Sequence, residues 1–274
     1  MNIIKKTIRW GVERSGIDTD KFFDIFPAAG DQMGIDPFAD MQRFVKAEDK
    51  MVVFDVGGNL GQSVKRIRNA FPNASVHSFE PSPSTFKKLK ANCEGMADVK
   101  TWNNGVGSTN GTLSFQENDH SDMSSFLQPS QNAWGKVVRS TEVPVIRVDS
   151  FAKEQKIDFI HILKSDTQGY DFEVLKGAEG LMKENKVGLV YFEFIFSEMY
   201  KNLPPFNEVF KYLMEQNFAL VTFYRAHFQK DLIGWTDVMF VNREFYQKRP
   251  GRKQTEGAEA EALTKSAAEH APTA

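Results

Sequence analysis

The sequence predicts an α/β fold in which helices cover both faces of one doubly wound, mostly parallel sheet. Short apolar runs of strand length alternate with segments whose apolar residues recur every three or four positions, the pattern of a helix with one buried face. Parallel neighbouring strands need crossover connections, and helices in those connections cover the sheet. The expected seven strands are 51–56, 74–79, 99–103, 159–164, 187–194, 218–224 and 238–242.

The end of this series differs from its beginning. Strands 218–224 and 238–242 have no helical segment between them, so we expect an antiparallel pair that closes one edge of the sheet. Two further strand candidates, 112–116 and 142–148, interrupt the alternation and predict a hairpin or an edge extension beside the ligand-binding end. In such sheets that end is formed by the carboxyl ends of the strands, near the point where the strand order reverses.

Length and composition fit one globular domain with an appendage at each end. The chain has 274 residues, of which 41% are hydrophobic and 26% are charged. We divide it into an extension at 1–48, a domain at 49–248 and a tail at 249–274. The tail has no aromatic residue and little large apolar surface to bury, so we expect it to be disordered.

Charge and cysteine content exclude several classes of protein. A formal net charge of −2 gives no general attraction to nucleic acid, and Cys93 alone permits neither an intramolecular disulfide nor a multi-cysteine zinc site. No apolar run approaches the roughly 18 residues of a membrane span, and the first residues do not resemble a signal peptide. We therefore expect a cytoplasmic protein. Ile4, Ile8 and Val12 have helical spacing, which suits packing on the domain or weak contact with a membrane surface.

The first strand ends at Asp55 and continues into a glycine-rich turn. Gly57, Gly58 and Gly61 allow a sharp turn and leave the main chain, including that of Asn59, open to a ligand. The helix that follows presents unpaired N–H groups and a positive dipole end there. The glycine spacing differs from the G-x-G-x-x-G of dinucleotide sites, and an aspartate before it suits an ammonium better than a pyrophosphate. These five residues are therefore candidate cofactor contacts.

The second strand leads into Glu80, Pro81 and Ser82. Glu80 follows Gly61 by 19 positions, and an acidic residue at this strand end accepts hydrogen bonds from ribose hydroxyls. Pro81 restricts the backbone, while Ser82 suits the cap of the next helix. This segment predicts nucleoside binding.

Three segments in this order resemble the FkbM-type methyltransferases over about residues 50–245: DVGGNLG at 55–61, FEP at 79–81 and KSDTQGYD at 164–171. The resemblance implies a Rossmann-like methyltransferase fold with S-adenosyl-L-methionine as cofactor. It implies that the first segment holds the methionine part, that Glu80 holds the ribose, and that Asn104 and Gly105 line the adenine slot. The third segment then faces the transferred methyl group.

The sequence departs from the commonest pattern of that family within the third segment. Ser165 stands where an apolar residue is usual, and Gln168 and Asp171 stand where glutamate is frequent. These differences leave the expected fold and cofactor unchanged. They leave open which carboxylate, if any, is the catalytic base.

A methyl group on a sulfonium is already activated, so its transfer mainly needs an acceptor atom in line with it. A hydroxyl acceptor also has to lose its proton. Asp166, which follows the central strand, is the first candidate for the base. It is also a candidate contact for the cofactor. Glu193 ends another apolar run, and His120 lies in a loop, where a histidine can act as a base or contact the substrate. Asp166 and Glu193 together could hold Mg²⁺, but we assign no metal ligand.

The acceptor implied by the resemblance is a hydroxyl of a sugar, glycan, glycolipid or secondary metabolite. Trp134, Trp235 and Asp237 lie in or next to loops that can cover a polar acceptor, because an aromatic face stacks on a sugar ring. Two alternatives stay open. One is a nicotinamide- or nucleotide-sugar-binding enzyme on the same sheet, and the other is a non-catalytic nucleoside-binding module. The sequence does not predict the oligomeric state.

Overall fold

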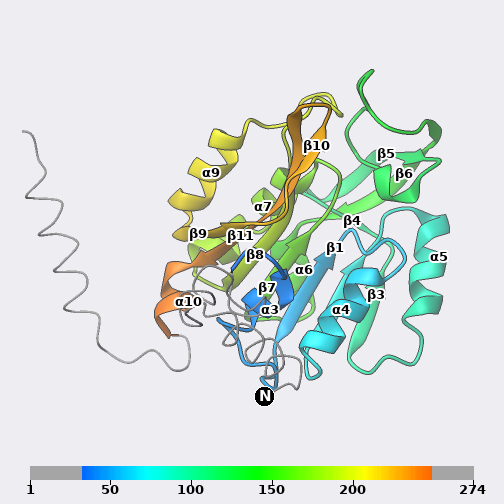
Figure 1. Ribbon diagram of the computed structural model, residues 1–274. Helices are drawn as coiled ribbons and strands as arrows, with labels where there is room; N and C mark the ends of the chain where they lie inside the picture. The colour runs from blue at the N-terminus through cyan, green and yellow to red at the C-terminus, as the bar shows by residue number, and fades with distance from the viewer. Residues whose placement is uncertain (1–32, 249–274) are drawn as a thin grey trace, which may run out of the picture.

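A computed structural model describes residues 33–248, so the predicted tail and the helical pattern at Ile4, Ile8 and Val12 lie outside the described residues. An eight-stranded sheet runs through the molecule in the order β10-β11-β8-β7-β1-β2-β3, and β9 also pairs with β11 (Figure 1). Its strands are β1 (Val52–Val56), β2 (Ser75–Phe79), β3 (Val99–Trp102), β7 (Ile160–Ser165), β8 (Val187–Ile195), β9 (Phe218–Phe223), β10 (His227–Gln229) and β11 (Leu232–Asn242).

The pairing confirms the predicted doubly wound, mostly parallel sheet. Strands β3, β2, β1, β7 and β8 pair with their neighbours in parallel. Strand β11 is antiparallel to both β8 and β9, as expected for the closing edge. The chain winds outward from β1 to β3 and then returns to β7 on the other side of β1. The strand order therefore reverses between β1 and β7, where their carboxyl ends meet.

The closing edge differs from the sequence prediction in one respect. Strand β11 begins at Leu232 instead of residue 238, and its first part pairs with β10, which makes an eighth strand. The first part of this strand could not be predicted from the sequence, because Gly234, Thr236 and Asp237 interrupt the apolar run. Strand β10 itself has only three residues, too few for a period-two pattern to be read.

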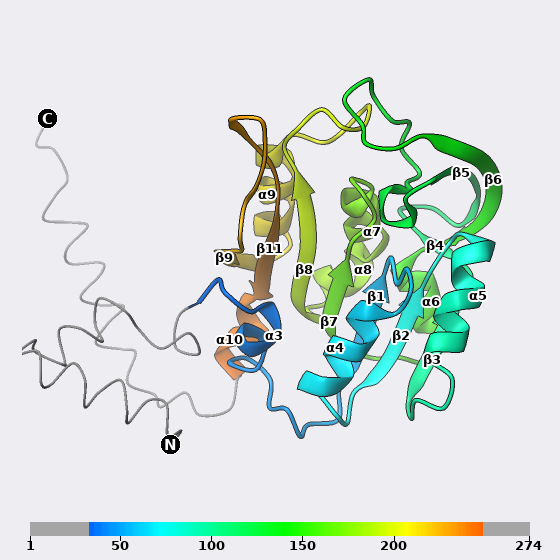
Figure 2. The same ribbon diagram turned by 45° about the vertical axis from the view of Figure 1, so that its right-hand side comes forward.

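The two extra strand candidates form an antiparallel pair, β5 (Gly111–Asn118) and β6 (Val137–Ile146). With β4 (Gly105–Val106) they make a separate three-stranded sheet. Figures 1 and 2 show this small sheet beyond the carboxyl ends of β1 and β2. The connection between β5 and β6 contains the 3₁₀ helix η1 (Ser121–Met123). Elements far apart in the sequence thus meet at the predicted ligand-binding end.

Two apolar clusters cover the two faces of the large sheet, because successive side chains of a strand point to opposite sides. Phe54 and Val56 of β1 join one cluster and Val53 joins the other. The first face packs against α6 (Val148–Glu154), α7 (Asp171–Gly177), α8 (Glu179–Lys183) and α9 (Phe206–Glu215). The second packs against α3 (Pro37–Met41), α4 (Gln62–Ala70), α5 (Pro83–Asn92) and α10 (Arg243–Lys248).

Helix α3 lies within the segment that the sequence analysis assigned to the extension. The side chain of Asp36 caps this helix by accepting a hydrogen bond from the backbone N–H of Phe38 at 3.0 Å. Phe38, Met41 and Phe44 are buried in the same cluster as Val53 of β1. These residues of the 33–48 segment therefore contribute to the core of the sheet's second face.

Candidate active site

The glycine turn after β1 is shaped by its contact with the chain that leaves β7. Gly57 has φ +77°, and a Cβ placed on it would lie 1.9 Å from the carbonyl oxygen of Asp166. A Cβ on Gly58 would lie 2.2 Å from Oγ of Ser78. Gly61, with φ +89°, begins α4. A side chain at position 57 would separate the ends of β1 and β7, and one at position 58 would separate the turn from β2, so these two glycines allow the strand ends to approach.

Asp55 lies beneath this turn. Strand alternation places it on the same face as Val53, toward α4, and its side chain is fully buried. Its Oδ2 accepts hydrogen bonds from Ser63 at 2.9 Å and from Ser78 at 2.7 Å, while Nζ of Lys164 lies 3.1 Å from Oδ1. The structure thus places Asp55 under the turn and not on the wall of the pocket described below.

Lys164 ties Asp55 to the turn. Its ammonium also donates to the carbonyl oxygens of Val56 at 3.4 Å and Gly57 at 3.2 Å. Burial alone would lower the pKa of Lys164, but the carboxylates of Asp55, Asp166 and Asp171 together more than offset this, and the pKa is raised. The ammonium therefore stays charged and supports the backbone of the turn from below.

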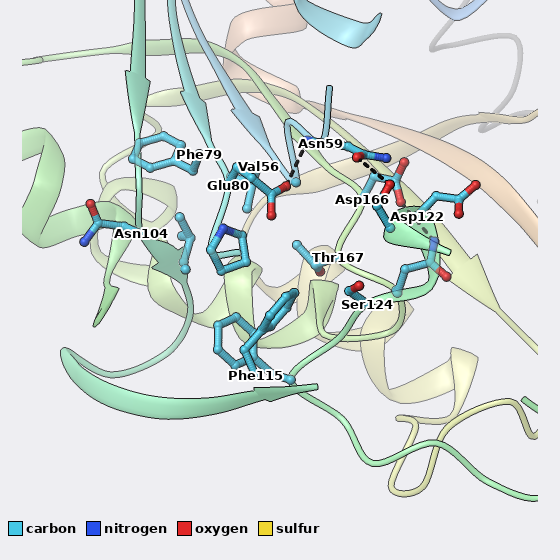
Figure 3. A pocket seen from close by; sticks show the side chains of 17 residues that line it. Val56, Asn59, Phe79, Glu80, Asn104, Phe115, Asp122, Ser124, Asp166 and Thr167 are labelled. Carbon is cyan, nitrogen blue, oxygen red and sulfur yellow. Dashed lines mark hydrogen bonds between the residues drawn. The ribbon is translucent and has the colours of Figure 1, made fainter. Parts of the chain in front are cut away.

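A pocket opens above the turn, between the carboxyl ends of the strands and the small sheet (Figure 3). It encloses about 580 Å³ of empty space, open solvent at its mouth included. We call it the nucleoside pocket. The predicted cofactor residues on its wall are Gly57, Asn59, Glu80, Pro81, Asn104, Gly105 and Asp166.

Glu80 is the buried acidic group of the nucleoside pocket. One carboxylate oxygen accepts a hydrogen bond from the backbone N–H of Asn59 at 2.9 Å (Figure 3). The other accepts from the backbone N–H of Ser82, also at 2.9 Å. Burial raises the pKa of Glu80 to about 7, and these hydrogen bonds oppose the shift. Each carboxylate oxygen has a second lone pair to offer, so Glu80 can accept two hydroxyl groups of a ribose.

The other end of the nucleoside pocket is apolar. Phe79, Phe115 and Phe126 line it, and the rings of Phe115 and Phe126 meet edge to face with centroids 4.9 Å apart. A Cβ on Gly105 would lie 2.3 Å from Cζ of Phe126, so only glycine allows this ring to close against β4. An apolar slot beside the amide of Asn104 suits a flat heteroaromatic base.

Four of the predicted cofactor contacts lie behind the wall: Asp55, Gly58, Gly61 and Ser82. Ser82 caps α5 by accepting from the N–H of Thr85, and its Oγ donates to Glu117 at 2.8 Å. These residues shape the turn and the start of the helices around the pocket.

The connection between β5 and β6 supplies wall residues that the sequence analysis did not identify. Ser121, Asp122 and Ser124 line the nucleoside pocket, and Oγ of Ser121 donates to Oδ1 of Asn59 at 3.0 Å. This hydrogen bond joins the connection to the glycine turn. The only local signal was the polar stretch around His120, which does not show where the segment folds.

A second pocket adjoins the nucleoside pocket and brings together the three predicted catalytic residues. His120, Asp166 and Glu193 line it, together with Trp134 and Trp235. We call it the tryptophan pocket; it encloses about 880 Å³ of empty space, open solvent at its mouth included. The two pockets share three wall residues, which are Asp122, Asp166 and Gln168.

Gln168 connects the two predicted catalytic carboxylates. Its Nε2 donates to Oδ1 of Asp166 at 3.2 Å and to Oε2 of Glu193 at 3.0 Å. Its Oε1 accepts from the hydroxyl of Tyr200 at 3.1 Å. Burial, followed by the charge of Asp166, raises the pKa of Glu193 well above its ordinary value. A raised pKa is the direction of shift that a carboxylate needs in order to act as a base near neutral pH.

Aromatic rings form the outer wall of the tryptophan pocket. Trp134 and Trp235 meet edge to face, with ring centroids 5.3 Å apart. His227 stacks on Trp235 at 5.0 Å with an interplanar angle of 3°, which fixes the orientation of the indole. The wall of the pocket thus combines carboxyl groups with flat apolar faces.

The described residues contain no group of three or more His, Cys, Asp or Glu side chains placed to hold a metal ion. Across residues 33–248, no helix has the length and apolar character needed to cross a membrane.

Comparison with known proteins relates this arrangement to one family. Residues 55–220 match the methyltransferase FkbM domain. The chain is 24% identical over 202 residues to the 2-O-methyltransferase NoeI of Sinorhizobium fredii, covering 70% of this chain and 79% of that protein. It is 27% identical over 175 residues to the hexuronic acid methyltransferase AglP of Haloferax volcanii, covering 62% of this chain and 64% of that protein. Among solved structures, the Methanococcus jannaschii fibrillarin pre-rRNA processing protein superposes with a TM-score of 0.44 at 12% identity, over 71% of this chain and 67% of that one.

Proposed function

Because the chain belongs to the FkbM methyltransferase family and has a Rossmann-like fold, we propose that it is an O-methyltransferase that methylates a hydroxyl group of a sugar-containing acceptor. The observation that carries this proposal is the common wall of the two pockets. Asp122, Asp166 and Gln168 separate a site suited to a nucleoside from a site suited to a polar ring. Methyl transfer needs two substrates side by side, and this wall is where their reacting groups would meet.

The nucleoside pocket fits S-adenosylmethionine. The open backbone at Gly57 accommodates the methionine part, Glu80 accepts the ribose hydroxyls, and the slot at Phe115 and Phe126 takes the adenine. The bound cofactor supplies an electrophilic methyl group on its sulfonium. Family membership does not support the alternatives of a nicotinamide enzyme or a non-catalytic nucleoside-binding module.

The tryptophan pocket fits the acceptor. The indole faces of Trp134 and Trp235 give a sugar ring an apolar surface, and the carboxylates opposite accept hydrogen bonds from its hydroxyls. The named activities of NoeI, a 2-O-methyltransferase, and of AglP, a hexuronic acid methyltransferase, support a carbohydrate hydroxyl as the acceptor.

Glu193 is the general base in this proposal. Its raised pKa suits the uptake of a hydroxyl proton, and Nε2 of Gln168 holds its carboxylate in place. Asp166 lies on the common wall, so it can orient either substrate. His120 lies on the acceptor side and contacts the acceptor rather than the cofactor.

The test is methyl transfer from labelled S-adenosylmethionine to a panel of glycosides, combined with binding of S-adenosylmethionine and NAD⁺ measured by calorimetry. We expect binding of S-adenosylmethionine alone. Trp235→Ala should raise the KM for the acceptor by about tenfold, equivalent to about 1.4 kcal/mol, and leave the cofactor Kd unchanged. Phe228→Ala, on the same hairpin but outside the pocket, is the matched control and should change neither value. An unchanged acceptor KM in Trp235→Ala would remove the tryptophan pocket from the acceptor site.

A further inference from the structure

The tryptophan pocket carries a one-sided set of ionisable groups. Asp122, Asp166 and Glu193 contribute three carboxyl groups to its wall. Among the described residues no lysine or arginine lines it, and His120 is its single basic side chain. The other wall residues are apolar or neutral. A methyl-acceptor molecule bound here therefore faces three carboxyl groups and a single imidazole.

The nearest buried cation offsets this charge only in part, because Lys164 lowers the pKa of Glu193 less than Asp166, Asp171 or Asp237 raises it. Lys164 lies 3.1 Å from Oδ1 of Asp55, and its remaining hydrogen bonds go to the backbone beneath the glycine turn. It is buried and does not reach the pocket wall. The carboxylates of the pocket also act on each other, since Asp166, after burial, is the largest cause of the upward pKa shift of Glu193.

We propose that the acceptor is a neutral or amine-bearing sugar and that the tryptophan pocket rejects acceptors with a carboxylate, sulfate or phosphate next to the methylated hydroxyl. An anionic group in this position would lose its water shell against three carboxyl groups and could gain only His120 as a basic partner. A protonated amine in the same position would gain a carboxylate partner. This inference rests on the proposed function, and it separates the chain from its relative AglP, which is named for hexuronic acid.

The first test compares three matched acceptors: the methyl glycosides of glucose, glucosamine and glucuronic acid, at low salt, where charge effects are largest. We expect kcat/KM for the glucuronide to be at least about tenfold below that of the other two. Asp122→Asn, which keeps the shape and removes one charge, should narrow this gap at least about threefold. A change that only disturbed the fold would lower all three rates together. If kcat/KM for the glucuronide equalled that for the glucoside, the inference would be overturned and the proposed function would still stand.

The second test does not depend on knowing the acceptor. Trp134 is 48% exposed, so its fluorescence, taken as the difference between the wild type and Trp134→Phe, reports on ions entering the pocket. Relative to free N-acetyltryptophanamide, caesium should quench this signal better than iodide, and Asp122→Asn should reduce the preference. Equal or better quenching by iodide would overturn the inference. If anions are excluded but no glycoside is methylated, the sugar acceptor of the proposed function is wrong and the charge preference still holds.

Discussion

Nε2 of Gln168 lies 3.0 Å from Oε2 of Glu193, and the same nitrogen also donates to Asp166. A single neutral amide thus holds two carboxyl groups that would otherwise repel each other. The hydroxyl of Tyr200 fixes the other end of this amide. The position of Gln168 is unusual in its backbone as well, with φ +54°. The loop after β7 thus holds the side chain of Gln168 between Asp166 and Glu193, the proposed base.

Gln168→Glu should move the pH dependence of kcat to higher pH. A third carboxylate beside Glu193 raises the pKa of that base further, and the base works only when it is deprotonated. At neutral pH we expect kcat to fall by about tenfold and to recover partly at pH 9. Gln155→Glu, at the end of α6 and away from both pockets, is the control. If Gln168→Glu lowered kcat by the same factor at every pH, the result would contradict the positioning role of Gln168.

Glu193→Gln should separate the base from its neighbour Asp166. Without the base, kcat falls by about 10²-fold or more, and the rise of kcat with pH disappears. Asp166→Asn should keep this rise and lower kcat less. Cofactor affinity has to be measured for both variants, because Asp166 also lines the nucleoside pocket. If Asp166→Asn shows the larger loss in kcat with normal cofactor affinity, the roles are exchanged.

Glu80 should make cofactor binding depend on pH. Its pKa is about 7 because of burial, and the deprotonated form is the better acceptor for two hydroxyl groups. The affinity for S-adenosylmethionine should therefore rise between pH 6 and pH 8 and then level off. The amine of the cofactor also titrates, so the signal is the difference between the wild type and Glu80→Gln. Parallel curves for the two proteins would place the ribose elsewhere.

Gly57→Ala should cost far more stability than Gly95→Ala. Both glycines have φ +77°, so an alanine at either position meets the same backbone strain, about 1–2 kcal/mol. A Cβ at Gly95 meets nothing within 4 Å, whereas at Gly57 it lies 1.9 Å from the backbone of Asp166. Urea denaturation should give the ordinary cost for Gly95→Ala, and for Gly57→Ala a larger cost with loss of cofactor affinity. Equal costs would mean that the two strand ends separate easily.

The predictable part of the site comes from residues next to strands. Glu80 and Asp166 follow apolar runs directly, and parallel strands bring their carboxyl ends to one edge, so both positions could be read from the pattern. Asp55 shows the limit of this reasoning. It also ends a strand, but strand alternation turns it toward α4, and its partner Lys164 lies more than 100 positions away in the sequence.

Several wall residues that escaped prediction lie on connections. Phe126 and Asp122 belong to the segment between β5 and β6, whose path is set by contacts with distant parts of the chain. One is the hydrogen bond between Ser121 and Asn59, and another is that from Tyr200 to the carbonyl oxygen of Met123. Such contacts leave no periodic pattern, and a polar loop sequence is compatible with many paths.

The segment between β5 and β6 has a consequence for the kinetic order of the reaction. Ser121 and Ser124 form part of the wall of the nucleoside pocket, while Met123 and Trp134 of the same segment form part of the wall of the tryptophan pocket. A movement that releases one ligand therefore disturbs the site of the other. We expect the cofactor to bind before the acceptor, and the methylated product to leave before the spent cofactor. The spent cofactor would then inhibit competitively against S-adenosylmethionine, and every other pair of product and substrate would give non-competitive or uncompetitive inhibition.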